Sequence, residues 1–372
     1  MKIQDFINIL GSDFYTGVPD SLLNPLCYYL MNTYGTDPRH HVMAANEGNC
    51  VAVAAGYHMA TGRTPVVYLQ NSGEGNIVNP VTSLLNDKVY GIPMIFVIGW
   101  RGEPGIHDEP QHIFQGEITC RLLDDLNIKS FVLSQETSPV KLKEMMSEFS
   151  HELHNGKQVA FVIKKNAITY EDHYEFRNHY SLKREEIIEH IVKYSADDPV
   201  ISTTGKASRE LFEIREREGQ SHQYDFLTVG SMGHCSSIAL GIAEFKPDKK
   251  IWCIDGDGAA LMHLGALPVI GYAHPENLVH IVINNGCYET VGGEPTVMKD
   301  LDIAQIAKDS GYDCTVRVED VEALDRALNE ARKNNRLTLI EVMAAVGARA
   351  DLGRPTTTAM ENKISFMSFL QR

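Results

Sequence analysis

The sequence predicts an α/β protein built from two doubly wound, mostly parallel sheets, and three observations support this. Short apolar runs alternate with helical patterns along the whole chain, as in parallel sheets covered by helices on both faces. A polar and aromatic stretch at residues 171–182 interrupts this alternation near the middle. The length of 372 residues exceeds that of one ordinary core. We therefore expect domains at residues 1–170 and 183–372, joined by a linker and without a middle domain.

Six strands are expected in each half. In the first half they are residues 14–16, 41–44, 65–69, 93–98, 129–133 and 159–164. In the second half they are residues 199–203, 224–227, 250–254, 278–283, 314–318 and 337–343. The polar tail after Gly347 is expected to be either a lid over the active site or a solvated end.

Composition narrows the range of partners. With 49 acidic and 34 basic residues the net charge is -15, which argues against nucleic acid or an anionic membrane as the main partner. The seven cysteines show no CxxC pair, and we expect buried thiols in a reducing cytoplasm. No apolar run approaches the length of a membrane span and the first residues do not resemble a leader, so a soluble cytoplasmic protein is expected.

The stretch from 249 to 288 carries the strongest chemical signal. An apolar run ends in Asp255-Gly256-Asp257-Gly258, a helical pattern follows, and a second apolar run ends in Asn284-Asn285-Gly286. In a parallel βαβ unit both strand ends lie at the same edge of the sheet, so Asp257 and Asn285 can converge. A carboxylate, an amide oxygen and a nearby backbone carbonyl suit Mg²⁺ when a ligand phosphate supplies further oxygens. The glycines allow a phosphate to approach a helix N-terminus.

Two other interpretations of this stretch fail. A dinucleotide-binding fingerprint needs a third glycine where this chain has Leu261. A calcium-binding loop needs a glycine where this chain has Ala260.

The GDG and NN turns together resemble the signature of enzymes that use thiamin diphosphate. The resemblance implies that Asp257, Asn285 and the carbonyl of Cys287 bind Mg²⁺, which holds the diphosphate. It also places Gly256, Gly258 and Ala259 at the cofactor. In the run LTVGSMGHCSSIALG it implies that Gly230 and Met232 contact the cofactor, with Met232 as the apolar wedge that keeps the cofactor bent.

The first half carries the matching motifs of the pyrimidine-binding domain. Glu47 lies at the start of a helix in VMAANEGNCVAVAAGYHMATG, and the resemblance makes it the acid that contacts the pyrimidine ring. Such an acid favours the imino tautomer of the cofactor, whose amine can then act as the base. The small residues of this helix were expected to form its packing face: Ala52, Ala55, Gly56 and Ala60. The NSGEGN loop resembles the family's SGxGxxN loop beside the pyrimidine, with Ser72, Gly73 and Asn76 as cofactor contacts. Because the two domains of this family meet across subunits, the resemblance implies at least a homodimer.

Further segments resemble the phosphonopyruvate decarboxylase family: FYTGVPDSLLNPL, DEPQH, TTGKASREL and RADLGRP. This implies conversion of 3-phosphonopyruvate to phosphonoacetaldehyde and carbon dioxide. It places Asp20 near the reacting carbon and makes His107 or His112 a proton donor. A second set is expected to bind the anionic substrate: Arg101, Lys206, Arg209, Arg349 and Arg354. A set of this many cations favours a phosphonate substrate, because a phosphonate carries more negative charge than a sulfonate.

Three alternatives stay open at this point. The first is a sulfopyruvate decarboxylase. The second is a carboligase acting on two 2-oxo acids, although the chain has no room for the flavin-binding middle domain of acetolactate-type synthases. The third is a non-catalytic nucleotide-binding protein on a degenerate scaffold, against which the intact motifs argue.

Overall fold

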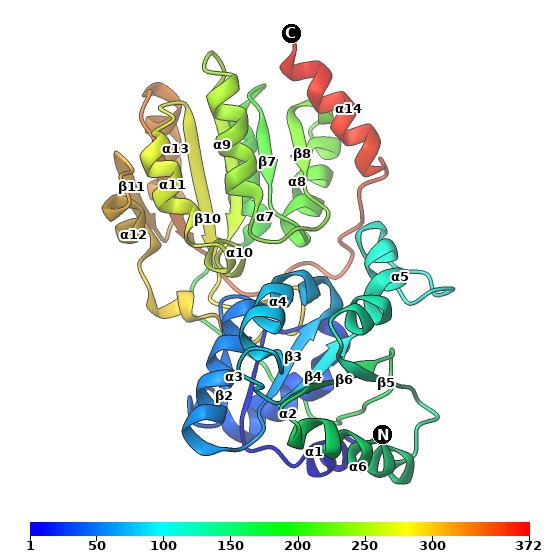
Figure 1. Cartoon of the computed structure of the whole chain (residues 1–372). Coiled ribbons are helices and arrows are strands. Elements are labelled where there is room, and N and C mark those ends of the chain that lie inside the picture. Colours follow the sequence, from blue (N-terminus) through cyan, green and yellow to red (C-terminus); the bar gives the residue numbers. More distant parts are fainter. The chain divides into compact units, whose positions relative to one another are not determined.

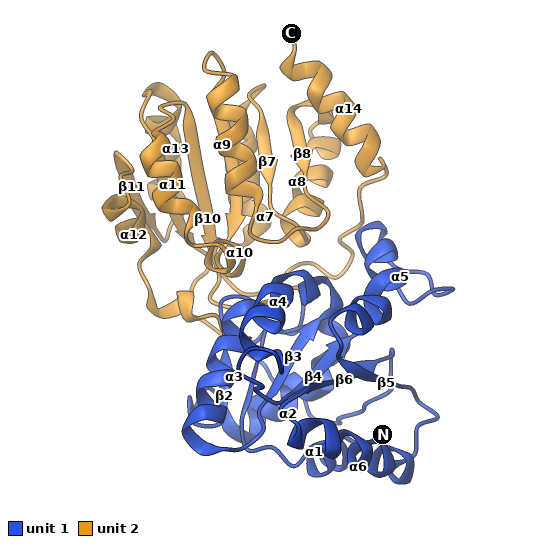
Figure 2. Ribbon diagram, viewed as in Figure 1, with its two compact units in different colours: residues 1–175, 291–294 blue, residues 176–290, 295–372 orange.

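The structure is a computed structural model that describes residues 1–372. The chain divides into two compact units, each with its own sheet (Figures 1 and 2). Unit 1 comprises residues 1–175 and 291–294, and unit 2 comprises residues 176–290 and 295–372. No helix or strand occurs between residues 171 and 183.

Unit 1 contains a six-stranded sheet in the order β2-β1-β3-β4-β6-β5. Every neighbouring pair is parallel. The strands are β1 (Tyr15–Gly17), β2 (His41–Met43), β3 (Val66–Gln70), β4 (Met94–Gly99), β5 (Lys129–Leu133) and β6 (Gln158–Ile163). The interior strands β4 and β6 are buried along their whole length, which explains why the sequence shows them as continuous apolar runs.

Helix α1 precedes the first strand, and the other helices of unit 1 connect successive strands. They are α1 (Ile3–Leu10), α2 (Asn24–Tyr34), α3 (Glu47–Thr61), α4 (Glu74–Pro80), α5 (Pro110–Asp125) and α6 (Pro139–His154). Two short 3₁₀ turns are η1 (Ser21–Leu23) and η2 (Asn71–Gly73), and a π-helical segment, η3 (Val81–Leu85), continues α4. Apolar side chains of α1, α2 and α6 share one core cluster with strand side chains that include Tyr68, Val97 and Phe161.

Unit 2 repeats this architecture with the strand order β11-β12-β10-β9-β7-β8, again parallel throughout. Its strands are β7 (Val200–Ser202), β8 (Asp225–Leu227), β9 (Ile251–Gly256), β10 (Leu278–Asn284), β11 (Cys314–Val318) and β12 (Thr338–Met343). Strand β10 lies at the centre and is buried at all seven positions.

The helices of unit 2 cover both faces of its sheet (Figure 1). They are α7 (Arg184–Ser195), α8 (Lys206–Arg217), α9 (Cys235–Phe245), α10 (Asp257–Met262), α11 (Ala266–Ala273), α12 (Ile303–Asp309), α13 (Val321–Lys333) and α14 (Ala359–Leu370). The turns are η4 (His222–Tyr224) and η5 (Val297–Asp300). Side chains of α7, α8 and α13 pack around Trp252 in one core cluster.

Strand β8 is an edge strand, and α14 covers its open side. The Asn362 side chain accepts a hydrogen bond from the Leu227 amide at 3.1 Å and donates to the Asp225 carbonyl at 2.9 Å. Helix α14 begins with a capping box in which Thr358 and Glu361 bond reciprocally to each other's backbone.

The predicted fold class is confirmed, and all twelve predicted strands are present. Two details differ. The buried face of α3 is formed by Glu47, Cys50, Val51, Ala54 and Ala55, so of the small residues expected there only Ala55 is buried. All seven cysteines are free thiols, but Cys120 and Cys314 are only partly buried. No helix combines the length and the apolar character that a bilayer crossing requires.

Candidate active site

The aspartate and asparagine turns of unit 2 lie at the same edge of its sheet. Strands β9 and β10 are parallel neighbours, with Asp255 opposite Val282 and Gly256 opposite Ile283. The chain leaves both strands at their carboxyl ends, into α10 at Asp257 and into the turn at Asn285. The side chains predicted to share a metal ion therefore start from adjacent positions.

Asp257 is a buried carboxylate surrounded by neutral donors. The Thr296 hydroxyl donates to Oδ2 at 2.7 Å, and the amides of Gly258 and Gly286 also stabilise the charge. Burial outweighs these donors and raises the pKa of Asp257 to about 7. No cationic side chain is among the groups that act on it. A buried carboxyl of this kind fits a bound cation.

Asn285 supplies an amide oxygen beside this carboxylate. Its Oδ1 accepts from the Cys287 amide at 3.1 Å, and its Nδ2 donates to Glu289 at 3.0 Å. The preceding Asn284 turns into the sheet instead and donates to Glu341 at 2.8 Å. Nowhere do three or more His, Cys, Asp or Glu side chains gather as metal ligands. The oxygens of Asp257, Asn285 and the Cys287 carbonyl are thus a mixed set that suits Mg²⁺.

Met232 lies beside the GDG turn. A Cβ atom added at Gly258 would lie 3.5 Å from the Met232 methyl carbon and 2.6 Å from the Tyr288 ring. The loop that carries Met232 turns back at Gly233, whose φ of +84° and close approach to the Ala259 carbonyl both require glycine. Gly256 and Ala259 belong to the same turn in sequence, and Gly230 lies two residues before Met232.

In unit 1, Glu47 is the first residue of α3 and is only 5% exposed. Asn76 donates from Nδ2 to Glu47 Oε2 at 2.6 Å. A Cβ atom added at Gly73 would lie 2.4 Å from Glu47 Oε1, so the loop packs directly on the carboxyl group. The structure thus brings together Glu47, Gly73 and Asn76, which the sequence placed in two separate motifs.

A second carboxyl group of unit 1 is fixed by a short hydrogen-bond chain. The Ser72 hydroxyl donates to Gln70 Oε1 at 2.8 Å, and Gln70 Nε2 donates to Asp20 Oδ1 at 2.6 Å. Asp20 is fully buried, and its Oδ2 has no hydrogen-bond partner. Burial raises the pKa of Asp20, although Gln70 and the charge of Arg101 oppose this.

The loop after β4 holds the remaining residues predicted in unit 1. Arg101 forms a bidentate pair with Asp108, with contacts of 2.8 and 2.5 Å. His107 is exposed, whereas His112 is 9% exposed in the first turn of α5 and its Nδ1 has no partner. Burial, followed by the charge of Arg101, lowers the pKa of His112.

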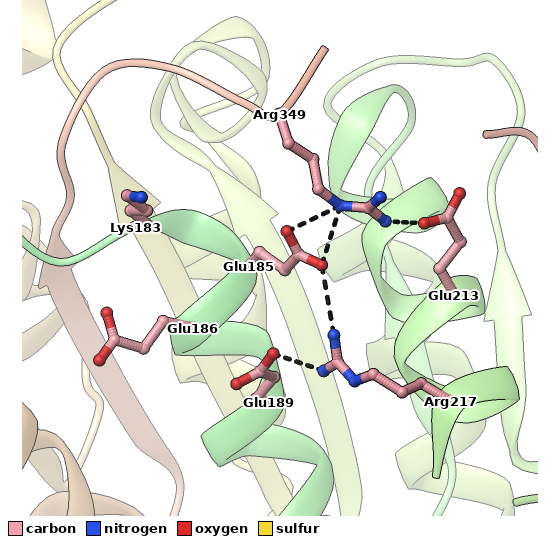
Figure 3. A pocket seen from close by; sticks show the side chains of 7 residues that line it. All are labelled: Lys183, Glu185, Glu186, Glu189, Glu213, Arg217 and Arg349. Carbon is pink, nitrogen blue, oxygen red and sulfur yellow. Dashed lines mark hydrogen bonds and ion pairs between the residues drawn. The ribbon is translucent and has the colours of Figure 1, made fainter. Parts of the chain in front are cut away.

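The cations predicted in unit 2 have protein partners. Lys206 donates to Glu289 at 2.8 Å, and Arg209 donates to the carbonyls of Leu352 and Gly353. Arg349 contacts Glu185 and Glu213 at the edge of a pocket of about 550 Å³ between α7 and α8 (Figure 3). Arg354 also has an interaction partner.

Sequence reasoning missed four residues that shape these sites. Gln70 and Thr296 hold Asp20 and Asp257, as described above. Glu289 joins four elements because it accepts from Arg184, Lys206, Asn285 and the Gly347 amide. Glu294 is fully buried in unit 1 without a hydrogen-bond partner. Gln70 comes directly after the predicted strand 65–69, and Glu289 lies shortly after the predicted strand 278–283. A polar side chain close to the end of a predicted strand is the signal that could have identified them.

Comparisons with known proteins agree with this geometry. Residues 3–127 match the model of the thiamine pyrophosphate enzyme N-terminal TPP binding domain, and residues 203–342 match the C-terminal TPP binding domain. The chain is 32% identical to a phosphonopyruvate decarboxylase of Streptomyces viridochromogenes, over 97% of this chain and 92% of that protein. It is 31% identical to a phosphonopyruvate decarboxylase of Streptomyces hygroscopicus, over 97% of this chain and 91% of that protein. A sulfopyruvate decarboxylase of Methanosarcina acetivorans is 25% identical, over 82% of each chain.

Proposed function

Since this chain belongs to the thiamin diphosphate-dependent enzymes, in the phosphonopyruvate decarboxylase family, we propose that it converts 3-phosphonopyruvate to phosphonoacetaldehyde and carbon dioxide. The chain is a decarboxylase that uses thiamin diphosphate. When bound, this cofactor supplies a nucleophilic carbon that adds to the ketone and accepts the electrons left behind by carbon dioxide. The convergence of Asp257 and Asn285 at one sheet edge is the observation that carries the proposal.

Unit 2 holds the diphosphate end in this proposal. Asp257, Asn285 and the Cys287 carbonyl bind Mg²⁺, and the amides at Gly256, Gly258 and Ala259 lie near the diphosphate. In this proposal Gly230 and Met232 also contact the cofactor, with Met232 as the wedge. The support is the buried Asp257 carboxyl, which lacks a cationic partner, and the position of Met232 against Gly258.

Unit 1 activates the pyrimidine end. Glu47 presents its carboxyl to the ring, and Asn76 and Gly73 fix the orientation of that carboxyl. Ser72 lies on the same loop and connects to Asp20 through Gln70. The proposed pyrimidine-binding and diphosphate-binding domains are residues 1–170 and 183–372.

Substrate binding draws on residues of both units. Asp20 lies near the reacting carbon, and His107 and His112 are the candidate proton donors of the loop after β4. Arg101, Lys206, Arg209, Arg349 and Arg354 bind the anionic groups. Because Arg101, Lys206 and Arg349 are paired with carboxylates, substrate has to compete with these acids for them.

Two substitutions separate cofactor binding from turnover. Glu47→Ala is expected to bind thiamin diphosphate with Mg²⁺ and to lose turnover. Asp257→Ala is expected to lose Mg²⁺-dependent binding of the cofactor. Calorimetry measures binding, and aldehyde formation measures turnover. A fully active Glu47→Ala enzyme would refute the mechanism.

The second candidate is decarboxylation of sulfopyruvate, which is favoured by the Methanosarcina relative. The two substrates are compared by kcat/KM in the same preparation at low substrate concentration. We expect 3-phosphonopyruvate to be preferred, and a higher kcat/KM for sulfopyruvate would reverse the assignment.

Assembly and location complete the proposal. We propose a homo-oligomer, at least a dimer, with active sites between subunits. We also propose a cytoplasmic location, because none of the seven cysteines forms a disulfide.

A further inference from the structure

Glu289, in the turn after β10, is a carboxylate whose two oxygens are both saturated by donors of unit 2. Its side chain is 8% exposed. Oε1 accepts from Lys206 at 2.8 Å and from Arg184 at 3.4 Å. Oε2 accepts from Arg184 at 3.1 Å, from the Asn285 side-chain amide at 3.0 Å and from the Gly347 backbone amide at 3.1 Å. A carboxylate offers about four lone-pair sites, so this group cannot turn without losing several bonds at once.

The donors on Glu289 come from segments that leave the sheet at one edge. Lys206 begins α8 after β7, Asn285 follows β10, and Gly347 follows β12. These strands run parallel, and β9 lies between β7 and β10. Their carboxyl ends therefore share the edge at which β9 leads into the GDG turn. Glu289 thus joins three segments beside the predicted metal ligands.

The Oε2 atom of Glu289 decides which end of the Asn285 amide is available to a cation. An amide has a donor end and an acceptor end, and only its oxygen can bind a metal ion. Asn285 directs Nδ2 to Glu289, while its Oδ1 accepts from the Cys287 amide at 3.1 Å and keeps a second lone pair. In the inverted orientation Oδ1 would face a carboxylate, which has no hydrogen to donate. Glu289 therefore selects the metal-binding orientation.

The Oε1 atom of Glu289 holds a cation that keeps spare donors. The Lys206 side chain is 26% exposed, and its ammonium group carries three N–H donors, so it can bind Glu289 and an anionic ligand together. Arg184 differs, because it is only 10% exposed and also forms a bidentate pair with Glu210 at 2.7 and 2.8 Å. Lys206 is thus the member of this cluster that can reach a substrate.

We propose that Glu289 is a positioning residue that serves the metal and the substrate from its two oxygens. Oε2 holds the Asn285 amide with its oxygen free to bind a divalent cation, and Oε1 holds Lys206 in place for the anionic end of the substrate. The substrate part rests on the function proposed above. The negative charge of Glu289 weakens the attraction of Lys206 for an anion, so position is gained at the expense of affinity.

Metal binding tests the first part without substrate. The protein is saturated with thiamin diphosphate and titrated with Mn²⁺ in place of Mg²⁺, and electron paramagnetic resonance measures the free ion. Glu289→Ala should bind Mn²⁺ at least about 10-fold more weakly than wild type. Glu289→Gln should bind it more tightly than Glu289→Ala, because its amide oxygen can accept from Asn285. Equal affinity of wild type and Glu289→Ala would overturn the proposal, as would wild-type protein that binds no Mn²⁺.

Glu210→Gln is the matched control. Glu210 is the other buried carboxylate on Arg184, and its side-chain hydrogen bonds go to that arginine. This variant should lose thermal stability but keep a Mn²⁺ affinity close to that of wild type. Equal weakening in Glu210→Gln and Glu289→Ala would show that the cluster acts only through stability. Glu289→Ala should itself fold, because Arg184 keeps Glu210 as a partner, and thermal unfolding checks this.

Steady-state kinetics at saturating Mg²⁺ and cofactor test the second part. Glu289→Ala should lower KM for 3-phosphonopyruvate several-fold, because a negative charge beside Lys206 is removed, and should also lower kcat, because Lys206 is no longer held. In a Lys206→Ala background the same substitution should leave KM unchanged. A higher KM in Glu289→Ala would overturn the substrate part, since a merely structural defect raises KM and lowers kcat together.

Failure of the proposed function gives a different result. In that case wild-type enzyme forms no carbon dioxide from either 3-phosphonopyruvate or sulfopyruvate, which overturns the substrate part. The Mn²⁺ titrations of wild type, Glu289→Ala and Glu210→Gln still decide whether Glu289 positions Asn285.

Discussion

At the scale of single residues, glycines make room for the groups that carry the proposed chemistry. Gly73 faces the Glu47 carboxyl, and Gly99 faces Asp20, where an added Cβ atom would lie 2.2 Å from Oδ2. Gly258 leaves space for Tyr288 and Met232. None of these three has a positive φ, so each is required by the neighbouring side chain and not by its own backbone. Substitution at these sites therefore tests the position of the neighbour.

Gly73→Ala should displace the Glu47 carboxyl while leaving cofactor binding largely intact. The new methyl group would lie too close to the Glu47 carboxyl group for both to keep their positions, and a displacement of about 1 Å can cost about 10²-fold in turnover. Steady-state kinetics and calorimetry with thiamin diphosphate measure the two effects. Gly56→Ala in the same helix as Glu47 is the control, because nothing lies within 4 Å of its added Cβ atom. Equal activity of the two variants would contradict the placement of Glu47.

Glu74 should make stability depend on pH. Burial raises its pKa to about 8 from the ordinary value of 4.5. The folded state therefore holds this proton more tightly than the unfolded state does. The resulting stabilisation is complete below about pH 4.5 and is lost as the pH rises through 8. Relative to Glu74→Gln, the free energy of unfolding of wild type should fall between pH 5 and pH 8, by at most about 5 kcal/mol. Denaturant unfolding of both proteins checks this, and parallel curves would contradict it.

At the scale of elements, the tail of residues 345–354 is held along α7 and α8 in unit 2. The Ala345 amide donates to the Leu182 carbonyl, and the Gly347 amide donates to Glu289 at 3.1 Å. Farther along, Glu213 accepts from the Gly353 amide and pairs with Arg349. The network continues to Glu185 and Arg217 (Figure 3). The tail is thus fastened by charged contacts, which can exchange with an anionic ligand.

Glu213→Ala should release the tail, because this one carboxylate holds both Arg349 and the backbone of Gly353. We expect cleavage by trypsin after Arg349 to become several-fold faster, with little change in the global unfolding transition. Glu186→Ala is the matched control, since Glu186 lines the same pocket and Figure 3 shows its side chain directed away from Arg349. Equal cleavage of the two variants would show that the tail is held by other contacts.

The order and boundaries of the elements were largely predictable. The edge strands β5 and β11 were predicted to the residue, although each is only partly buried. Strands that are buried along their whole length, such as β4 and β10, stand out in the sequence as continuous apolar runs. The buried face of α3 was not predicted, because small residues fit equally well on an exposed helix surface; Cys50 and Val51 are buried there, whereas Ala52 and Gly56 are exposed. The burial of Glu294 was also not predictable, because it depends on tertiary contacts that no local pattern signals.

At the scale of the whole molecule, the predicted site residues divide between the two units. Glu47, Ser72, Gly73 and Asn76 belong to unit 1, whereas Asp257, Asn285 and Met232 belong to unit 2. Each unit is an independent α/β structure with its own core. The convergence at one sheet edge could be predicted within unit 2 because parallel topology fixes it.

Two inactive variants should restore each other if active sites form between subunits. The Glu47→Ala and Asp257→Ala proteins are dissociated into subunits, mixed and allowed to reassociate. Half of the random dimers are hybrids, and each hybrid contains one intact site, so about a quarter of wild-type activity should return. The double variant mixed with itself is the control. No recovery after verified subunit exchange would indicate sites built within a single chain.

The Asn362 side chain has a consequence for solubility. Its amide bonds to the outer edge of β8 much as a neighbouring peptide group would, and it thereby occupies hydrogen-bonding positions at which a foreign strand could add. A chain shortened before Thr358 would uncover this edge. Self-association through exposed backbone, and not only loss of folding energy, would then limit the yield of the truncated protein.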